Sequence, residues 1–327
     1  MEKKRVLSGM RPTGLLHLGH FFGALQNWVK LQEDHECFYC IVDYHALTTD
    51  YEDTSNLKDY IFNMAVDWMA AGLNPKKSTI FIQSAVKEHA ELHLLLSMVV
   101  PLGWLLRVPT YKEQLREIKG KDLHTYGFLG YPVLQAADIV VYKAGIVPIG
   151  EDQLPHLELT REIVRRFNHF YGNVFPEPEA MLTEVSRLPG TDGRKMSKSY
   201  NNSIFLSDPP ELMRSKIMMM VTDPARKRRN DPGNPDICPV FAFHKVFSPP
   251  EKIVEIDREC RRAGIGCTEC KSYLADHVKK RFSDFIDRRN QFASDKRKME
   301  AMLAEGAERA RAVASETVRE VREAVKL

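Results

Sequence analysis

Hydrophobic positions in the first half of the chain alternate between short continuous runs and longer segments with helical spacing. The short runs predict buried strands at residues 5–9, 36–42, 78–84 and 146–149. Apolar residues three and four positions apart predict helices over residues 19–32, 55–72, 90–100, 128–142 and 153–168. Strands that alternate with helices in this way predict an α/β fold, in which helices cover both faces of a parallel sheet.

The pattern changes after about residue 187. Residues 188–203, "LPGTDGRKMSKSYNNS", form a polar loop that is too long to be a simple connection. From Pro209 onward the apolar spacing is helical, and residues 271–325 predict two long amphipathic helices. A chain of 327 residues exceeds the usual size of one core, so we expect an α/β domain at 1–205 and a helical domain at 206–327.

Composition and charge narrow the class of protein. Hydrophobic residues make up 43% of the chain and charged residues 28%, which is ordinary for a globular protein. The net charge of +3 permits a nucleic-acid partner only through a local basic patch. The sequence has no apolar run long enough for a membrane span and no apolar signal core near its start. We therefore expect a cytoplasmic protein, in which cysteines stay reduced.

The stretch "TGLLHLGH" is the first candidate for phosphate chemistry. It places His17 and His20 around Gly19 at the start of a predicted helix. Free N–H groups and the helix dipole favour an anion there, and two imidazoles can donate to phosphate oxygens as charge develops. Gly19 would let a nucleotide approach the backbone closely. Alone, the string is also compatible with a structural helix start.

The stretch "GRKMSKSYNN" is the second candidate. Lys195 and Lys198 flank Met196 and Ser197 in the polar loop, and two lysines suit a departing pyrophosphate as point charges. A solvated basic loop is the simpler interpretation of such a lysine pair by itself. The two stretches together, about 180 residues apart, make a far more specific signal than either alone.

This combination resembles the class I aminoacyl-tRNA synthetases, which activate an amino acid with ATP and transfer it to tRNA. The resemblance implies a Rossmann-like catalytic domain, a helical anticodon-binding domain, and ATP with Mg²⁺ that has no dedicated protein cage. The implied catalytic residues are His17, Gly19, His20, Lys195 and Lys198. The implied ATP contacts are Arg11, Thr13, Gly14, His17, His20, Gly150, Asp152, Lys195, Met196, Ser197 and Lys198.

Three further stretches resemble the tryptophanyl-tRNA synthetases: residues 40–48, 131–142 and 147–168. The resemblance implies L-tryptophan as substrate, tRNA(Trp) as partner, and a homodimer. Asp138 would accept the indole N–H, a donor only, from a helix face shared with Tyr131 and Gln135. The implied tryptophan contacts are Leu7, His45, Tyr131, Gln135, Asp138 and Gln153.

Three positions depart from the pattern of many bacterial members of that family. Arg11 stands where glutamine is common, His20 where asparagine is common, and Gln135 where methionine is common. Arg11 can bind a phosphate or a carboxylate bidentately, and Gln135 can add a hydrogen bond to the pocket. These departures concern contacts to the substrates and leave the expected reaction unchanged.

Other functions are compatible with parts of the pattern. A tyrosyl-tRNA synthetase is the nearest alternative, because the two families share this architecture. A small-molecule nucleotidyltransferase also uses an HxGH motif, but it needs neither KMSKS at this distance nor a helical RNA-binding domain. An inactive RNA-binding homologue is disfavoured because both motifs are intact.

Four cysteines in the last third of the chain follow the pattern C-x21-C-x6-C-x2-C: Cys238, Cys260, Cys267 and Cys270. Four thiolates suit either tetrahedral zinc or a [4Fe–4S] cluster. Some tryptophanyl-tRNA synthetases resemble this sequence in carrying a [4Fe–4S] cluster near the anticodon with nearly this spacing, which makes the cluster our expectation. Zn²⁺ and unligated thiols are the alternatives. Cys37 and Cys40 also form a CxxC pair, but in a strand they face opposite ways, so we expect core packing.

The predicted helical domain also carries basic residues. Lysine and arginine contacts to phosphates position an RNA without reading its sequence. We expect most of these charges to be ordinary surface charges and a few to contact tRNA. The candidates are Arg226, Lys227, Arg228, Arg229, Lys279, Lys280 and Arg281.

Overall fold

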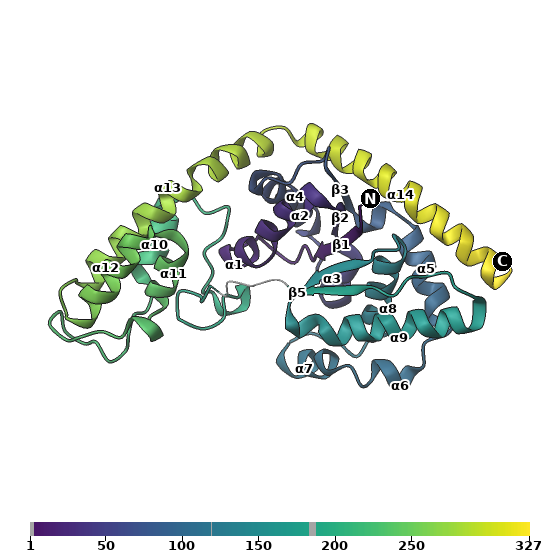
Figure 1. Cartoon of the computed structure of the whole chain (residues 1–327), viewed down its shortest axis with the longest axis horizontal. Helices are drawn as coiled ribbons and strands as arrows, with labels where there is room; N and C mark the ends of the chain where they lie inside the picture. The colour runs from purple at the N-terminus through teal and green to yellow at the C-terminus, as the bar shows by residue number, and fades with distance from the viewer. Residues whose placement is uncertain (1–2, 119, 183–187) are drawn as a thin grey trace.

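A computed structural model describes residues 3–118, 120–182 and 188–327 (Figure 1). In these ranges, one parallel sheet contains five strands in the order β3-β2-β1-β4-β5, which confirms the predicted α/β fold. The strands are β1 (Arg5–Met10), β2 (Glu36–Ile41), β3 (Ser78–Ile82), β4 (Ile146–Ile149) and β5 (Glu179–Leu182). Strand order reverses direction at β1 and β4, and the carboxyl ends of strands at such a point leave a crevice for ligands.

Helices cover both faces of the sheet and make up a second group beyond it. Those of the first half are α1 (Leu18–His20), α2 (Gln26–Asp34), α3 (Asp43–Asp50), α4 (Leu57–Ala71), α5 (Glu88–Ser97), α6 (Leu102–Leu105), α7 (Pro109–Glu117), α8 (Tyr126–Val140) and α9 (Leu154–Tyr171). Those that follow are α10 (Pro210–Met219), α11 (Pro239–Phe247), α12 (Pro250–Arg261), α13 (Cys267–Ala293) and α14 (Lys296–Val325). No helix in the described ranges is long and apolar enough to cross a bilayer.

The two faces of the sheet belong to two different hydrophobic clusters. On β2, Cys37 and Tyr39 pack with α2 and α4, whereas Phe38 and Cys40 pack with α5, α8 and α9. This alternation is the two-residue period of a strand with both faces buried. Cys37 and Cys40 are both buried on opposite faces, which confirms the prediction that they pack in the core.

Three local features differ from the sequence prediction. The helix predicted over 19–32 is α1, a π-helical segment at Phe21–Leu25, and α2. The apolar run at 36–42 ends as a strand at Ile41, and α3 begins two residues later. Strand β5 was not predicted, because it has only three apolar residues in a row and none of its four residues is buried.

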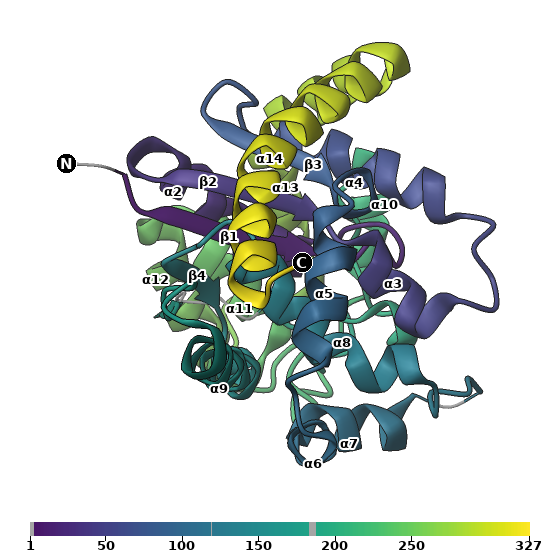
Figure 2. The same cartoon turned by 90° about the vertical axis from the view of Figure 1, so that its right-hand side faces the viewer.

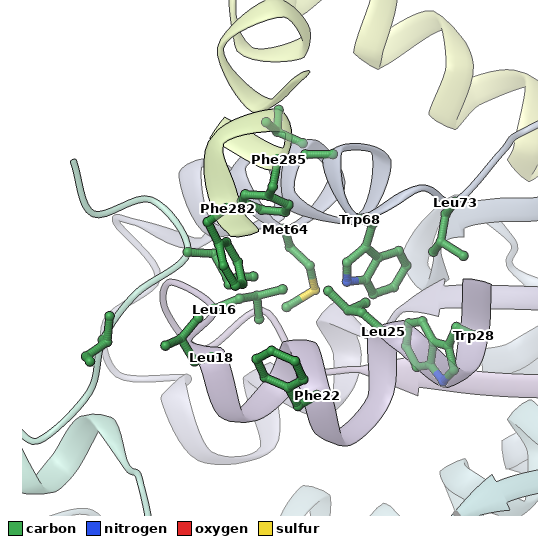
Figure 3. Packing of buried hydrophobic residues seen from close by; sticks show 14 of the residues in the cluster. Leu16, Leu18, Phe22, Leu25, Trp28, Met64, Trp68, Leu73, Phe282 and Phe285 are labelled. Carbon is green, nitrogen blue, oxygen red and sulfur yellow. The ribbon is translucent and has the colours of Figure 1, made fainter. Parts of the chain in front are cut away.

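Helix α13 connects the group of C-terminal helices to the sheet (Figure 1). Its amino end packs with α10 and α11, and its carboxyl half packs with α4. Phe282 and Phe285 of α13 insert beside Leu16, Phe22 and Met64 in the core under the sheet (Figure 3). Helix α13 is therefore anchored in the same core that holds the start of α1.

Helix α14 lies along the edge strand β3 and along α5 (Figure 2). Gly306 permits this contact, because a Cβ there would meet the Ile80 carbonyl oxygen at 1.8 Å. Arg309 donates to the carbonyls of Pro75 and Ser78 at 2.8 and 3.3 Å. By sequence position α14 falls in the predicted helical domain, 206–327, whereas its packing partners belong to the sheet and its helices.

Candidate functional site

A cavity of about 620 Å³ opens at the carboxyl ends of β1 and β4. This is the crevice expected where the strand order reverses. Its wall comes from β1, the turn at α1, α3, α8, β4 and the start of α9. The predicted site residues that line it are Leu7, Arg11, Gly19, His20, His45, Tyr131, Gln135, Asp138, Gly150, Asp152 and Gln153.

Asp138 lies at the buried end of this cavity, inside a network of donors. Gln83 Nε2 donates to both carboxylate oxygens, at 2.7 and 2.9 Å. His45 Nε2 lies 2.8 Å from Oδ2, and His89 Nδ1 lies 2.6 Å from Oδ1. Burial acts to raise the pKa of Asp138, but the hydrogen bonds from His45 and His89 outweigh it and hold the pKa below its usual range. The group is an ionised acceptor whose oxygens already receive two contacts each.

The His17–His20 pair forms a neutral stack at the start of α1. The ring centroids are 3.7 Å apart, and the His17 backbone N–H donates to His20 Nδ1 at 3.1 Å. Burial and Lys198 lower the pKa of His17 to about 4, and burial also lowers the pKa of His20. Since Nδ1 of His20 accepts, its hydrogen is on Nε2, where the neutral ring can donate to a phosphate oxygen.

Gly19 has a packing role in this turn that the sequence did not indicate. A Cβ on Gly19 would lie 2.9 Å from Nδ1 of His17, closer than a real side chain permits. Gly19 therefore makes room for the His17 ring.

Backbone hydrogen bonds join the two phosphate motifs. Leu18 N–H donates to the Ile204 carbonyl at 3.0 Å, and Leu206 N–H donates to the Leu16 carbonyl at 2.8 Å. The segment after "KMSKS" therefore runs beside the segment before "HLGH" as a short antiparallel pair. Two motifs that lie about 180 residues apart in the chain are neighbours in the fold.

Asn202 holds the KMSKS loop in shape. Its Nδ2 donates to Asp192 Oδ1 at 2.7 Å and to the Lys195 carbonyl at 3.1 Å, and its Oδ1 accepts from Ser197 N–H at 2.8 Å. Asn202 is 1% exposed. A buried amide with this many partners makes one loop conformation strongly favoured.

Lys198 extends from this loop toward the glycine turn before α1. Its Nζ would lie 3.1 Å from a Cβ on Gly14, whose φ of +129° also requires glycine. Burial, together with Arg11, lowers the pKa of Lys198 to about 8. Arg11 donates to Thr49 Oγ1, while its buried Nε has no partner among the described residues. Two cations thus stand close together near the Asp50 carboxylate, and such a pair is suited to phosphate.

Some of the predicted site residues line the cavity at its rim, and others are absent from its wall. Met196 is buried in the core cluster beneath the loop. Gln153 donates to Asp152 Oδ2 at 3.1 Å, at the cavity's polar rim. The residues that do not line the cavity are Thr13, Gly14, His17, Lys195, Met196, Ser197 and Lys198.

Sequence reasoning did not identify all the polar residues around the cavity. Gln83 follows β3, so its place after the carboxyl end of a parallel strand was a signal that could have been used. His89, Thr110 and His156 carry no comparable signal, because they come from the interiors or starts of three separate helices.

The four clustered cysteines converge on the amino end of α13. Burial and the nearby thiols of Cys238, Cys260 and Cys267 raise the pKa of Cys270 to about 12. Two other side chains border the group: Arg226 Nη1 lies 3.8 Å from Cys260 Sγ, and His244 Nε2 lies 3.3 Å from Cys270 Sγ. All six cysteines are unpaired. Over 3–118, 120–182 and 188–327, however, no three His, Cys, Asp or Glu side chains stand at metal-ligating positions.

Several of the basic residues proposed to contact tRNA donate hydrogen bonds to backbone carbonyls of the protein itself. Arg226 donates to the Ile265 carbonyl at 2.7 Å. Arg229 donates to the carbonyls of Ala263 and Gly264, and Arg281 donates to the Val246 carbonyl. Arg226 and Arg229 thus hold the loop before α13, and Arg281 holds the carboxyl end of α11, whereas among the described residues no such contact to a carbonyl is found for three of their neighbours. Those neighbours are Lys227, Arg228 and Lys280.

Comparisons with known proteins agree with this geometry. The family described as "tRNA synthetases class I (W and Y)" matches residues 1–283. A tryptophan–tRNA ligase of Thermotoga maritima is 53% identical over 99% of this chain and 99% of its own length. One from Aquifex aeolicus is 45% identical over 99% of this chain and 100% of its own. The crystal structure of a Campylobacter jejuni tryptophanyl-tRNA synthetase with ADP and tryptophan is 35% identical, with a TM-score of 0.90 over 99% of this chain and 100% of that one.

Proposed function

The chain belongs to the class I tRNA synthetases for tryptophan and tyrosine, and we propose that its cavity binds tryptophan at the buried end and ATP beside the HLGH and KMSKS motifs. Its activity is that of a tryptophan–tRNA ligase. A carboxylate oxygen of tryptophan attacks the α-phosphorus of ATP, the bond to the β-phosphate breaks, and pyrophosphate leaves. A terminal ribose hydroxyl of tRNA(Trp) then attacks the tryptophanyl carbonyl, the bond to the phosphate breaks, and AMP leaves.

The pairing of the two motifs carries the nucleotide part of this proposal. His20 can donate from Nε2 to a phosphate oxygen, and Lys198 and Arg11 supply positive charge on the same side. Positive charge and donors placed where the pyrophosphate develops stabilise the transition state more than bound ATP. Mg²⁺ accompanies the ATP phosphates and reduces their charge.

The test is pyrophosphate exchange into ATP, with tryptophan or tyrosine as the amino acid. Exchange that depends on tryptophan and not on tyrosine is the expected result. Exchange with tyrosine of equal efficiency would support the tyrosyl alternative, and exchange with neither would overturn the proposal. Charging of tRNA(Trp) tests the second step.

We propose that the four converging thiols hold a [4Fe–4S] cluster, with Zn²⁺ as the alternative. Four thiols on three elements, bordered by the Arg226 guanidinium, suit an anionic four-thiolate group. When bound, such a group would link α11, α12 and α13. Iron, acid-labile sulfide and zinc measured after purification without oxygen would identify it. If the protein contains neither iron nor zinc, the proposal is wrong and the four cysteines are free thiols. These are Cys238, Cys260, Cys267 and Cys270.

We further propose that helices α10–α13 recognise the anticodon arm, and that residues 1–205 carry the catalytic steps. Lys227, Arg228 and Lys280 are the best candidates for phosphate contacts, because other basic residues nearby already bind carbonyls. Replacing all three with alanine should weaken tRNA charging and leave pyrophosphate exchange intact. An equal loss in both assays would contradict this division of labour.

We also propose a homodimer that forms through α5 and α6. Leu94, Met98 and Leu102 are exposed there, with 53%, 71% and 59% of their surface open to solvent. Adjacent exposed apolar side chains of this kind are typical of an interface between copies of a chain. Light scattering of Met98→Glu should report a monomer, while Val254→Glu, at an exposed position on α12, should leave a dimer intact.

A further inference from the structure

Three side chains from three helices meet in the wall of the cavity. Thr110 comes from α7, Tyr131 from α8 and His156 from α9. The Tyr131 hydroxyl lies 2.7 Å from His156 Nε2 and 3.1 Å from Thr110 Oγ1, and Thr110 Oγ1 lies 3.0 Å from the same His156 nitrogen. Of these three residues, Tyr131 and His156 line the cavity, whereas Thr110 lies behind them.

The protonation states in this triangle follow from its burial. His156 is 3% exposed, and burial lowers its pKa to about 4, so the ring is neutral at neutral pH. Burial also raises the pKa of Tyr131, which keeps the hydroxyl protonated. A neutral imidazole nitrogen is either a donor or an acceptor, so the hydrogens can be counted.

Each tautomer of His156 allows an arrangement that keeps the Tyr131 hydroxyl hydrogen inside the triangle. If Nε2 carries a lone pair, Tyr131 O–H can donate to it and Thr110 O–H can donate to the Tyr131 oxygen. If Nε2 carries a hydrogen, it can donate to Tyr131, and Tyr131 O–H can donate to Thr110. In each of these two arrangements one lone pair of the Tyr131 oxygen is left, so the oxygen accepts toward the cavity.

We propose that Thr110 and His156 are positioning residues that hold the Tyr131 hydroxyl hydrogen, so that its oxygen accepts a hydrogen bond from the α-ammonium group of the amino acid. An ammonium group only donates, so an oxygen that only accepts recognises it and disfavours a carboxylate or a keto group at the same place. This inference rests on the proposed binding of tryptophan in the cavity. It assigns Thr110 a role in substrate selection without contact to the substrate.

Matched variants and three probes test it by calorimetric titration. Thr110→Val removes the hydroxyl at nearly the same volume, and Thr110→Ser keeps it. The probes are L-tryptophan, tryptamine, which has the ammonium group without the carboxylate, and indole-3-propionate, which has the carboxylate without the ammonium group. Thr110→Val should weaken tryptophan and tryptamine about 5- to 10-fold, the size of one lost hydrogen bond, and change indole-3-propionate less than about twofold. Thr110→Ser should bind all three like the wild type.

A double-mutant cycle shows whether Thr110 acts through Tyr131. Tyr131→Phe should produce the same selective loss, and adding Thr110→Val to it should weaken tryptophan no further. His156→Gln, which keeps a polar atom near Nε2, should retain more tryptamine affinity than His156→Leu. If a variant loses affinity for all three probes equally, the triangle has only a packing role. If the losses of affinity add up in the double variant, Thr110 does not act through Tyr131. A wild-type protein that binds none of the probes would instead overturn the proposed tryptophan site itself.

Discussion

Arg289 donates a hydrogen bond from Nε to Asp67 Oδ1 at 2.7 Å, and this ion pair joins α13 to α4 across 222 residues of chain. Arg289 Nη2 also donates to Asn63 at 2.7 Å. Asp67 is completely buried, and its second oxygen has no partner among the described residues. A buried carboxylate held by a single arginine makes this joint sensitive to the loss of either partner.

Replacing Arg289 with methionine should destabilise the protein by about 3–5 kcal/mol at pH 8, because it leaves a buried charge unpaired. Burial raises the pKa of Asp67 to about 6, although Arg289 opposes the shift. Folded Asp67 therefore binds its proton more tightly than the unfolded chain does. The resulting stabilisation is greatest below about pH 4 and is lost as the pH rises through 6. Without Arg289 the pKa rises further, so the penalty should be clearly smaller at pH 5.

Urea unfolding midpoints at pH 5 and pH 8 measure this difference. The double variant Asp67→Asn with Arg289→Met removes both charges and serves as the control, since it should recover stability at pH 8 and lose the pH dependence. A loss in Arg289→Met that is the same at both pH values would contradict the assignment.

Lys198 should make ATP binding weaken in alkaline solution. Burial and Arg11 lower its pKa to about 8, so the cation is present at pH 7 and mostly absent at pH 9. The protonated fraction falls about tenfold over that range, and the KM for ATP in pyrophosphate exchange should rise by a similar factor. Lys198→Arg keeps its charge and should flatten the profile. A wild-type KM for ATP that is constant from pH 7 to 9 would be the contrary result.

Asp138 should decide whether an indole N–H is required. The analogue 3-benzothienylalanine replaces that N–H with sulfur and keeps the shape, so the ratio of kcat/KM between tryptophan and this analogue measures the contact. Asp138→Asn should lower kcat/KM for tryptophan about 100-fold, because the buried donors of His45, His89 and Gln83 lose an ionised acceptor. Asp138→Asn should also lower the ratio of kcat/KM between tryptophan and 3-benzothienylalanine.

Gln135→Met is the matched comparison for this prediction. It should change the ratio less than about threefold, since Gln135 adds at most one further hydrogen bond at the cavity wall. If the ratio collapses in Gln135→Met and survives in Asp138→Asn, Gln135 accepts the indole N–H and Asp138 serves only to orient its histidines.

Gly306→Ala should destabilise the protein, although alanine favours helices over glycine by about 1 kcal/mol. The added Cβ would overlap the Ile80 carbonyl oxygen, and overpacking of this kind costs about 1–3 kcal/mol or displaces the helix. Gly127→Ala, in a helix where a Cβ meets nothing within 4 Å, should be neutral or stabilising. The unfolding temperatures of both variants give the comparison. Equal changes in unfolding temperature would mean that α14 can move away from β3 without loss of stability.

Local signals in the sequence were enough for much of the fold and the site. Alternation predicted that Cys37 and Cys40 face opposite sides of the sheet, and they do. Helical spacing predicted that Tyr131, Gln135 and Asp138 share a face, and all three line the cavity. These successes depend on periods of two and of three to four residues, which a sequence displays directly.

Contacts between distant segments were not predictable in the same way. The partners of Asp138 include His89, 49 residues earlier in a different helix, and no local pattern connects them. The π-helical turn at Phe21–Leu25 has the same apolar spacing as an ordinary helix, so the sequence did not distinguish the two; in the fold its Phe21 packs against Phe282. The turn before Cys267 contains Gly264 and Gly266, and glycine is the residue that most easily adopts a left-handed backbone. The residue that does so in the structure is Ala263, which its sequence did not indicate.

The position of α14 has a consequence for how the protein is made. Strand β3 is an edge of the sheet, and its Ser78 carbonyl receives a donor from Arg309 of α14 only after a further 231 residues have been synthesised. Until then the edge is open to pairing with another chain, and the apolar surface that α14 covers is exposed on the ribosome. The vulnerable period therefore lasts while residues 83–295 are synthesised, when β3 exists and its cover does not.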